Sequence, residues 1–314
     1  MGKKVNSSGQ LAANITKSAS KQTYYTIRLF ADSDRVADAY RAYGYFRWVD
    51  DVIDGELGSS VDRIAFINRQ KSLLESCYRG ESPGALCAEE WMLVDLVRND
   101  SEKNSGLQTY LRNMMDVMIF DAKRRGEVIS QVELFEYSHK LAKAVTEAIY
   151  YFIGHDDLSF CHEARYMAVT AAHITHMLRD AMEDVEAGYF NIPHEVLAAH
   201  GISPQSVQSQ VYREWVCERA QLARGYFKLG HECTSKVKNW RCRLAGYAYT
   251  ARFEWMLNTI ERDNYCLRSG YPERKSLWAG LWMVWSALTS MFDSLRIKTE
   301  PRKPTPQPVR VDKR

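Results

Sequence analysis

The placement of proline is the feature that most constrains how this chain folds. Between residues 20 and 295 proline occurs only at Pro83, Pro193, Pro204 and Pro272, each near a helix boundary expected from the surrounding pattern. No run of alternating β-branched residues suggests a sheet, and the helix-favouring residues Ala, Leu, Met, Glu, Lys and Arg are abundant. The sequence therefore predicts an all-α fold.

Short polar clusters divide the helical pattern. The predicted breaks are Gly55–Ser60, Arg79–Gly84, Asn99–Gly106, Gly154–Leu158, Gly188–Pro193 and Gly201–Pro204. Neither a fixed-period repeat nor a linker separates the helices, so we expect one domain over residues 19–296. We expect the polar residues 1–18 to form a flexible N-terminus and the basic, proline-rich residues 297–314 to form a disordered tail.

Composition excludes several classes of protein. A formal net charge of +3 and the lack of a Lys/Arg stripe argue against nucleic-acid binding. The seven cysteines are scattered without a CxxC pair, which predicts reduced thiols and a cytoplasmic protein. The first twenty residues lack the apolar region of a secretory signal.

Residues 276–292, SLWAGLWMVWSALTSMF, carry no charge. Their length is at the short limit for a membrane span. We interpret them first as a buried core helix. Peripheral contact with a membrane surface is the alternative, and a true span is the third and least favoured interpretation.

The stretch RWVDDVID, residues 47–54, places carboxylates on a mostly apolar helix. Asp50 and Asp54 are four residues apart and share one face, with Asp51 beside it. Repulsion at this spacing costs only about 0.2–0.5 kcal/mol, but carboxylates on a largely buried helix need a cation. Ligation by Asp oxygens suits Mg²⁺, and Arg47, one turn before Asp51, offers a planar donor fork for phosphate.

A second acidic stretch, LRDAMEDVEAG, occupies residues 178–188. Asp180 and Asp184 are again four apart, Glu183 is adjacent, and Arg179 precedes them. The upstream segment YMAVTAAHITHM is small and apolar, which indicates burial. The two stretches together predict facing helices that hold a cluster of Mg²⁺ ions around a diphosphate. The expected metal ligands are Asp50, Asp51, Asp54, Asp180, Glu183 and Asp184.

His173 and His176 have an HxxH spacing that could suggest zinc. Further His or Cys ligands, which a zinc site would need, are missing from the sequence pattern. We therefore expect both histidines to be structural or to line a pocket.

These motifs resemble the squalene/phytoene synthase family, the head-to-head trans-isoprenyl diphosphate synthases of the class I terpenoid synthase fold. The resemblance covers about residues 20–275, with YRAYGYFRWVDDVID and LRDAMEDVEAG as the two acidic motifs. Between them, MIFDAKRRGEVISQVELFEYSHKLAKAV is similar to the family's central helix pair, with Asp121 and Tyr137 at matching positions. The resemblance implies a helical bundle around a central cavity.

The resemblance implies that the reaction begins with departure of diphosphate from an allylic carbon, which leaves a carbocation. Metal ions and Arg would neutralise the leaving group, while a dry cavity with aromatic faces would protect the cation. We assign catalytic roles to Arg47, Asp50, Asp54, Tyr137, Asp180 and Asp184. The expected substrate-binding residues are Thr23, Tyr24, Tyr43, Phe46, Arg47 and Arg179, and Tyr166 is a further aromatic candidate for the cavity.

The sequence departs from the family at several positions that contact diphosphate. The Ser-x-Ser-Phe segment is here KQTY at residues 21–24, so only the hydroxyl of Thr23 remains. The V-A-G-x-V-G segment is LAKAVT at residues 141–146, and G-R-x-Y-x-P is GYFNIP at residues 188–193. The family's C-terminal Tyr and Arg fall on Phe253 and Gly270.

Three functions are compatible with this pattern. The first is head-to-head coupling of two farnesyl or geranylgeranyl diphosphates to a squalene- or phytoene-type product, with NADPH needed only for a squalene-type product. The alternative is a terpene synthase that cyclises a single prenyl diphosphate, as the departures would allow. A non-catalytic assembly factor is the second alternative. Oligomeric state and substrate chain length do not follow from the sequence.

Overall fold

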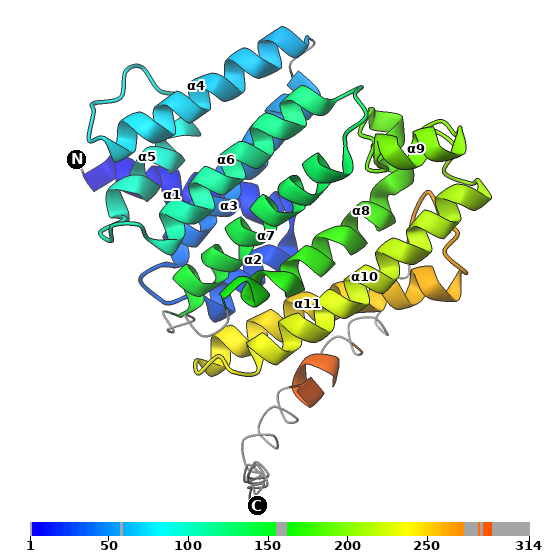
Figure 1. Cartoon of the computed structure of the whole chain (residues 1–314). Helices are drawn as coiled ribbons and strands as arrows, with labels where there is room; N and C mark the ends of the chain where they lie inside the picture. Colours follow the sequence, from blue (N-terminus) through cyan, green and yellow to red (C-terminus); the bar gives the residue numbers. More distant parts are fainter. Residues whose placement is uncertain (1, 57–58, 155–161, 273–281, 283–284, 291–314) are drawn as a thin grey trace, which may run out of the picture.

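The computed structural model describes residues 2–56, 59–154, 162–272, 282 and 285–290 (Figure 1). Within these ranges the chain is helical and contains no strand, which confirms the all-α prediction. A π-helical turn, η1 (Val52–Glu56), follows α3, and a 3-10 turn, η2 (His162–Tyr166), precedes α8. The α-helices are α1 (Gly2–Ala19), α2 (Lys21–Phe30), α3 (Val36–Asp51), α4 (Ser60–Tyr78), α5 (Glu90–Asn99), α6 (Gly106–Arg124), α7 (Gln131–Ile153), α8 (Met167–Ala187), α9 (His194–His200), α10 (Gln210–Thr234) and α11 (Trp240–Arg262).

Local signals in the sequence explain where the helices begin and end. Each predicted break coincides with the end of a helix or a helical turn, although residues 57–58 and 155–158 of two breaks lie outside the described residues. Ser130 and Glu133 form a reciprocal capping box at the start of α7, in which each side chain bonds the other residue's backbone N–H. Gly188 ends α8 with a φ of 87°, a left-handed conformation that glycine adopts without strain.

The N-terminal segment corrects one prediction. We expected residues 1–18 to be flexible, but they belong, from Gly2 on, to α1, where Ser8, Ala12 and Thr16 are buried. This stripe faces α3 at Gly44, where a Cβ atom would lie 3.1 Å from the Cα of Ala12. The segment is polar in composition, but its small side chains let two helix backbones approach closely. Packing, which composition does not reveal, therefore orders it.

The apolar core has two main parts. One is formed mainly by α3, α5 and α6, and the other mainly by α8, α10 and α11. Tyr137, on α7, packs against both. Figure 1 shows α7 in the middle of the bundle, between α6 and α8. The centre of the molecule thus lies between two packed halves, where a cavity can form.

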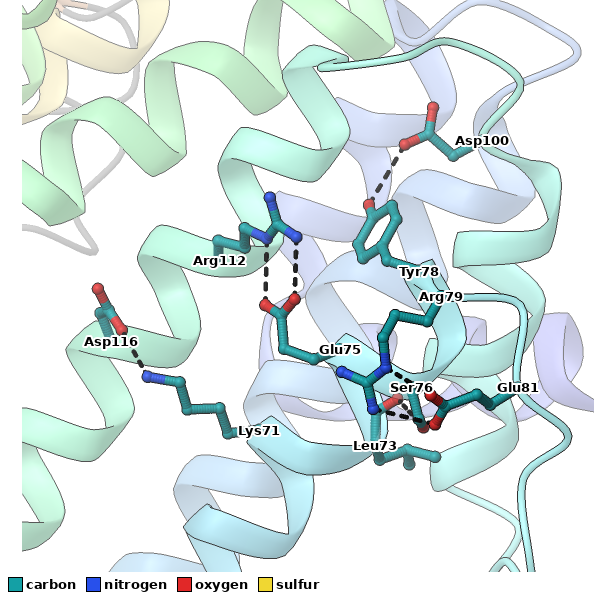
Figure 2. A network of polar contacts seen from close by, with 10 residues as sticks. All are labelled: Lys71, Leu73, Glu75, Ser76, Tyr78, Arg79, Glu81, Asp100, Arg112 and Asp116. Carbon is teal, nitrogen blue, oxygen red and sulfur yellow. Dashed lines mark hydrogen bonds and ion pairs between the residues drawn. The ribbon is translucent and has the colours of Figure 1, made fainter.

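A polar network joins α4 to α6 on the outside of the bundle (Figure 2). The guanidinium of Arg112 donates to both carboxylate oxygens of Glu75, at 3.1 and 2.9 Å, and Lys71 lies 3.6 Å from Asp116. The side chains of Arg112 and Glu75 are 47% and 33% exposed. Pairs this exposed contribute about 0–1 kcal/mol, so we expect the network to set helix register more than overall stability.

Several further predictions concern the ends of the chain and its cysteines. Across the described residues, the helices all fall short of the length and hydropathy needed to cross a membrane. Residues 276–292 lie mostly, and residues 297–314 entirely, outside the described ranges. Cys77, Cys87, Cys217 and Cys266 keep their thiols as predicted, whereas Cys233 takes part in a disulfide, contrary to the prediction.

Candidate active site

A polar cavity of about 260 Å³ lies where α3, η1, α6, α7 and α8 meet. Asp50 and Asp54 from the first acidic motif line it together with Asp180 and Asp184 from the second. The sequence interpretation required the two motifs to face each other across one cavity, and the structure confirms this placement. Asp121, on α6, adds a fifth carboxylate to the wall.

The end of α3 presents the first motif. Asp50 stands in the last turn of the helix, and Asp54 follows in the π-helical turn η1. Arg47 pairs with Asp51 and lies 3.6 Å from Asp50. Arg47 and Asp51 are 42% and 52% exposed and are not among the side chains that line the cavity. The structure therefore places these two residues beside the lining carboxylates, at the solvent side.

The middle of α8 presents the second motif. Nε of Arg179 donates to Oδ1 of Asp180 at 2.5 Å, and Nε2 of His176 lies 2.9 Å from Oδ2. Burial opposes ionisation of Asp180, but the hydrogen bonds from Arg179 and His176 outweigh it and hold its pKa below the ordinary range. Glu183 is exposed and does not line the cavity.

The cavity carries an excess of negative charge. Five aspartates line it against a single arginine, Arg124. Burial, reinforced by the charge of Asp54, raises the pKa of Asp50 to about 6. Burial, reinforced by Asp180, raises the pKa of Asp184 to about 7. A bound cation would relieve both effects, because it would favour the ionised form of each carboxyl group.

The donor atoms fit Mg²⁺. Within the described ranges, no three His, Cys, Asp or Glu side chains are already arranged closely enough to hold a metal ion. Mg²⁺ does not need such a closed cage, since it keeps several waters and usually binds one or two carboxylates together with substrate phosphates. Open pairs of aspartates on two facing helices meet that requirement.

Residues from the centre of the fold connect these carboxylates. The Tyr137 hydroxyl donates to Oδ2 of Asp121 at 3.1 Å, and Nε of Arg124 donates to Oδ1 at 2.8 Å. Arg124 also donates to Oδ1 of Asn191 at 2.9 Å, and Asn191 donates to Asp184 at 2.8 Å. Sequence reasoning did not select Arg124 or Asn191. The spacing of Arg124 from Asp121, three residues on one helix, was the available signal for Arg124.

Both histidines of the HxxH pair line the cavity, as predicted. His173 is buried, and its ring lies 5.0 Å from that of Tyr137 in an edge-to-face arrangement. Burial, with a smaller contribution from His176, lowers the pKa of His173 well below its ordinary value. His173 is therefore neutral at physiological pH.

A second, larger cavity of about 490 Å³ lies among α2, α3, α7 and α11. Most of its wall is apolar, and Thr23 and Tyr43 belong to its lining. Tyr24 stacks on Tyr40 with ring centroids 5.0 Å apart, and Phe46 packs edge-to-face on Tyr110 at 5.4 Å. Tyr24 and Phe46, which we predicted to bind substrate, line neither cavity.

Tyr166, the remaining aromatic candidate, also lines neither cavity. Its side chain is buried, and its hydroxyl donates to Glu147 at 2.7 Å. The structure thus gives Tyr166 a place in the core of the bundle.

The described residues form an all-helical fold with two aspartate pairs on one cavity, as expected for the class I terpenoid synthase fold. Residues 16–278 match the squalene/phytoene synthase family, and the chain belongs to that family. Its members are enzymes of the prenyltransferase type.

Two relatives show how similar the sequence is to characterised proteins. The presqualene diphosphate synthase of Zymomonas mobilis is 26% identical over 190 residues, which is 60% of this chain and 62% of that protein. Phytoene synthase 3, chloroplastic, of Zea mays is 24% identical over 271 residues, which is 82% of this chain and 61% of that protein. The aligned part thus spans about three fifths of each relative's length.

Solved structures share the fold at low sequence identity. Squalene synthase HpnC from Alicyclobacillus acidocaldarius superposes with a TM-score of 0.66 at 17% identity, covering 84% of this chain and 97% of that one. A dehydrosqualene synthase in complex with ligand gives a TM-score of 0.71 at 17% identity, covering 93% and 99%. These similarities support the fold assignment.

Proposed function

We propose that the protein ionises an all-trans prenyl diphosphate, farnesyl or geranylgeranyl diphosphate, and couples two such molecules head to head. The product would be of the squalene or phytoene type, with release of diphosphate. The observation that carries this proposal is the polar cavity lined by both aspartate pairs. Family membership supports the reaction class.

The polar cavity would bind the diphosphate end of the substrate. Asp50, Asp54, Asp180 and Asp184 would hold Mg²⁺, with about three ions expected, and Asp51 and Glu183 would assist from the solvent side. Bound Mg²⁺ supplies charge neutralisation for the leaving diphosphate. Arg47 and Arg179 would add donors to the phosphate oxygens once released from their aspartate partners.

The apolar cavity would bind the prenyl chain. Its lining side chains from α2, α3, α7 and α11 would exclude water from the allylic cation, which water would otherwise quench. Tyr43 would present an aromatic face there, and Thr23 a hydroxyl group at the wall. NADPH would be required only if the product is of the squalene type.

Product analysis tests this proposal. Purified protein is incubated with Mg²⁺ and one substrate at a time, geranyl, farnesyl or geranylgeranyl diphosphate, both with and without NADPH. A C30 or C40 hydrocarbon supports coupling, whereas a cyclic C15 or C20 product would instead establish the cyclase alternative. Asp50→Ala and Asp180→Ala serve as controls that should stay folded and lose turnover, and full activity in either would contradict the metal assignment.

Ligand-induced stabilisation separates an enzyme from a non-catalytic assembly factor. A ligand that binds only the native state stabilises it by about 2.7 kcal/mol at a hundred times its Kd. We expect Mg²⁺ with inorganic diphosphate to raise the melting temperature. An unchanged melting temperature would favour the assembly factor.

A further inference from the structure

The loops that follow α6 and α8 are tied together beside the polar cavity. The backbone N–H of Gly126 donates to the carbonyl oxygen of Gly188 at 2.7 Å, and Val128 and Phe190 form an isolated parallel bridge. A Cβ on Gly188 would lie 3.5 Å from the nitrogen of Gly126, in addition to the strain of its φ of 87°. The backbone around residues 188–190 is therefore fixed by contacts outside its own loop.

Two arginines at the end of α6 reinforce this arrangement. Nε of Arg125 donates to the carbonyl oxygen of Ala187 at 3.1 Å, and its Nη1 lies 3.4 Å from the carbonyl oxygen of Asp54. The guanidinium carbon of Arg124 lies 5.1 Å from the centre of the Tyr189 ring, close enough for a cation–π contact. The Tyr189 ring is thus held in place by contacts that do not involve its hydroxyl group.

Two side chains of the loop after α8 reach opposite acidic motifs. The Tyr189 hydroxyl donates to Oδ1 of Asp54 at 3.0 Å, and Nδ2 of Asn191 donates to Oδ2 of Asp184 at 2.8 Å. Asn191 is buried, and its Oδ1 accepts from Arg124, which orients its amide group toward Asp184. One short loop therefore holds a carboxylate from each motif.

We propose that Tyr189 is a positioning residue that orients Asp54 toward the shared cavity, as Asn191 orients Asp184 on the opposite wall. This inference rests on the proposed function, because it assumes that the cavity binds divalent cations. A carboxylate with one oxygen held by a protein donor keeps the other oxygen available for a metal. Removing such a supporting hydrogen bond typically weakens metal binding by about 10–100-fold.

Mn²⁺ binding in the presence of inorganic diphosphate provides a direct test. The free Mn²⁺ signal in electron paramagnetic resonance reports the dissociation constant without requiring turnover. Tyr189→Phe removes only the hydroxyl group, and we expect it to weaken Mn²⁺ binding about tenfold with an unchanged melting temperature of the metal-free protein. Tyr25→Phe, the same change at a tyrosine that is 53% exposed on α2, should leave the affinity unchanged.

A double-mutant cycle shows whether Tyr189 acts through Asp54. In an Asp54→Asn background, Tyr189→Phe should weaken binding no further, because its partner carboxylate is already gone. Unchanged affinity in Tyr189→Phe, or an equal loss in both backgrounds, would overturn the proposal while leaving the proposed function intact. If the unaltered protein binds no Mn²⁺ with diphosphate, the proposed function itself fails, and the positioning role falls with it.

Discussion

The Tyr137 hydroxyl donates a 3.1 Å hydrogen bond to Oδ2 of Asp121 and so joins α7 to α6 on the wall of the polar cavity. Burial raises the pKa of Asp121, while Arg124 and the Tyr137 hydroxyl oppose that effect by stabilising the ionised form. Tyr137 therefore helps to keep a carboxylate charged inside the cavity.

Replacing Tyr137 by Phe should impair catalysis more than folding. Without the hydroxyl, Asp121 loses a donor, and its pKa should rise further. We expect diphosphate release from farnesyl diphosphate to fall at least tenfold, while the free energy of unfolding decreases by about 1 kcal/mol, the usual contribution of one hydrogen bond. Coupled phosphate detection and urea unfolding measure the two effects. Turnover equal to that of the unaltered protein would remove Tyr137 from the catalytic residues.

The charge on Asp184 should make the stability of the metal-free protein depend on pH. Its folded-state pKa, about 7, is above the ordinary value of 3.8, so the folded state binds the proton more tightly than the unfolded state. This group therefore stabilises the fold below about pH 4 relative to higher pH, and the stabilisation is lost as pH rises through 7. Asp184→Asn removes the effect.

Thermal unfolding in the presence of a chelator checks the sign. The melting temperature of Asp184→Asn minus that of the unaltered protein should be larger at pH 8 than at pH 5. In samples without chelator, added Mg²⁺ should reduce the melting-temperature difference between the two proteins at pH 8. The cation would neutralise the Asp184 charge in the unaltered protein, and the variant has no such charge. A melting-temperature difference that is the same at both pH values would show that Asp184 is not perturbed in this way.

Replacing glycine by alanine should change the stability of the protein in opposite directions at two positions of α10. A Cβ at Gly230 would lie 2.6 Å from the backbone nitrogen of Ala168, whereas a Cβ at Gly225 would meet no atom within 4 Å. We expect Gly230→Ala to destabilise the protein by about 1–3 kcal/mol through overpacking. Gly225→Ala should stabilise it by about 0.5–1 kcal/mol through helix propensity. Urea unfolding compares them, and equal effects would mean that α10 does not pack on Ala168 as described.

Much of the fold could be predicted because its signals are local. Glycine and proline clusters mark helix ends through backbone geometry, and a helix or helical turn ends at each predicted break. Turns without such clusters, around residues 31–35 and 235–239, were not predicted. Helix α1 was also missed, since its order depends on a small-residue contact with Gly44 that only tertiary structure supplies.

In the candidate site too, residues marked by local spacing could be predicted, and residues that depend on tertiary contacts could not. Asp50, Asp54, Asp180 and Asp184 could be predicted because a spacing of four residues in helical backbone brings the members of each pair close together. Whether an aromatic side chain lines a cavity or packs in the core depends on its neighbours in the fold. Tyr43 lines the second cavity, whereas Phe46 packs against Tyr110. Tyr189 stands where the sequence departs from its family, and its contact with Asp54 requires the two loops to meet.

Under the proposed function, both acidic motifs bind the same magnesium–diphosphate unit. Calorimetric titration of Mg²⁺ with inorganic diphosphate into the unaltered protein, Asp50→Ala, Asp180→Ala and the double variant tests it directly. We expect each single change to abolish most of the binding and the double variant to lose little more. Two results would contradict a shared binding unit. One is binding that is retained in either single variant, and the other is losses of binding free energy that add in the double variant as they would for independent sites.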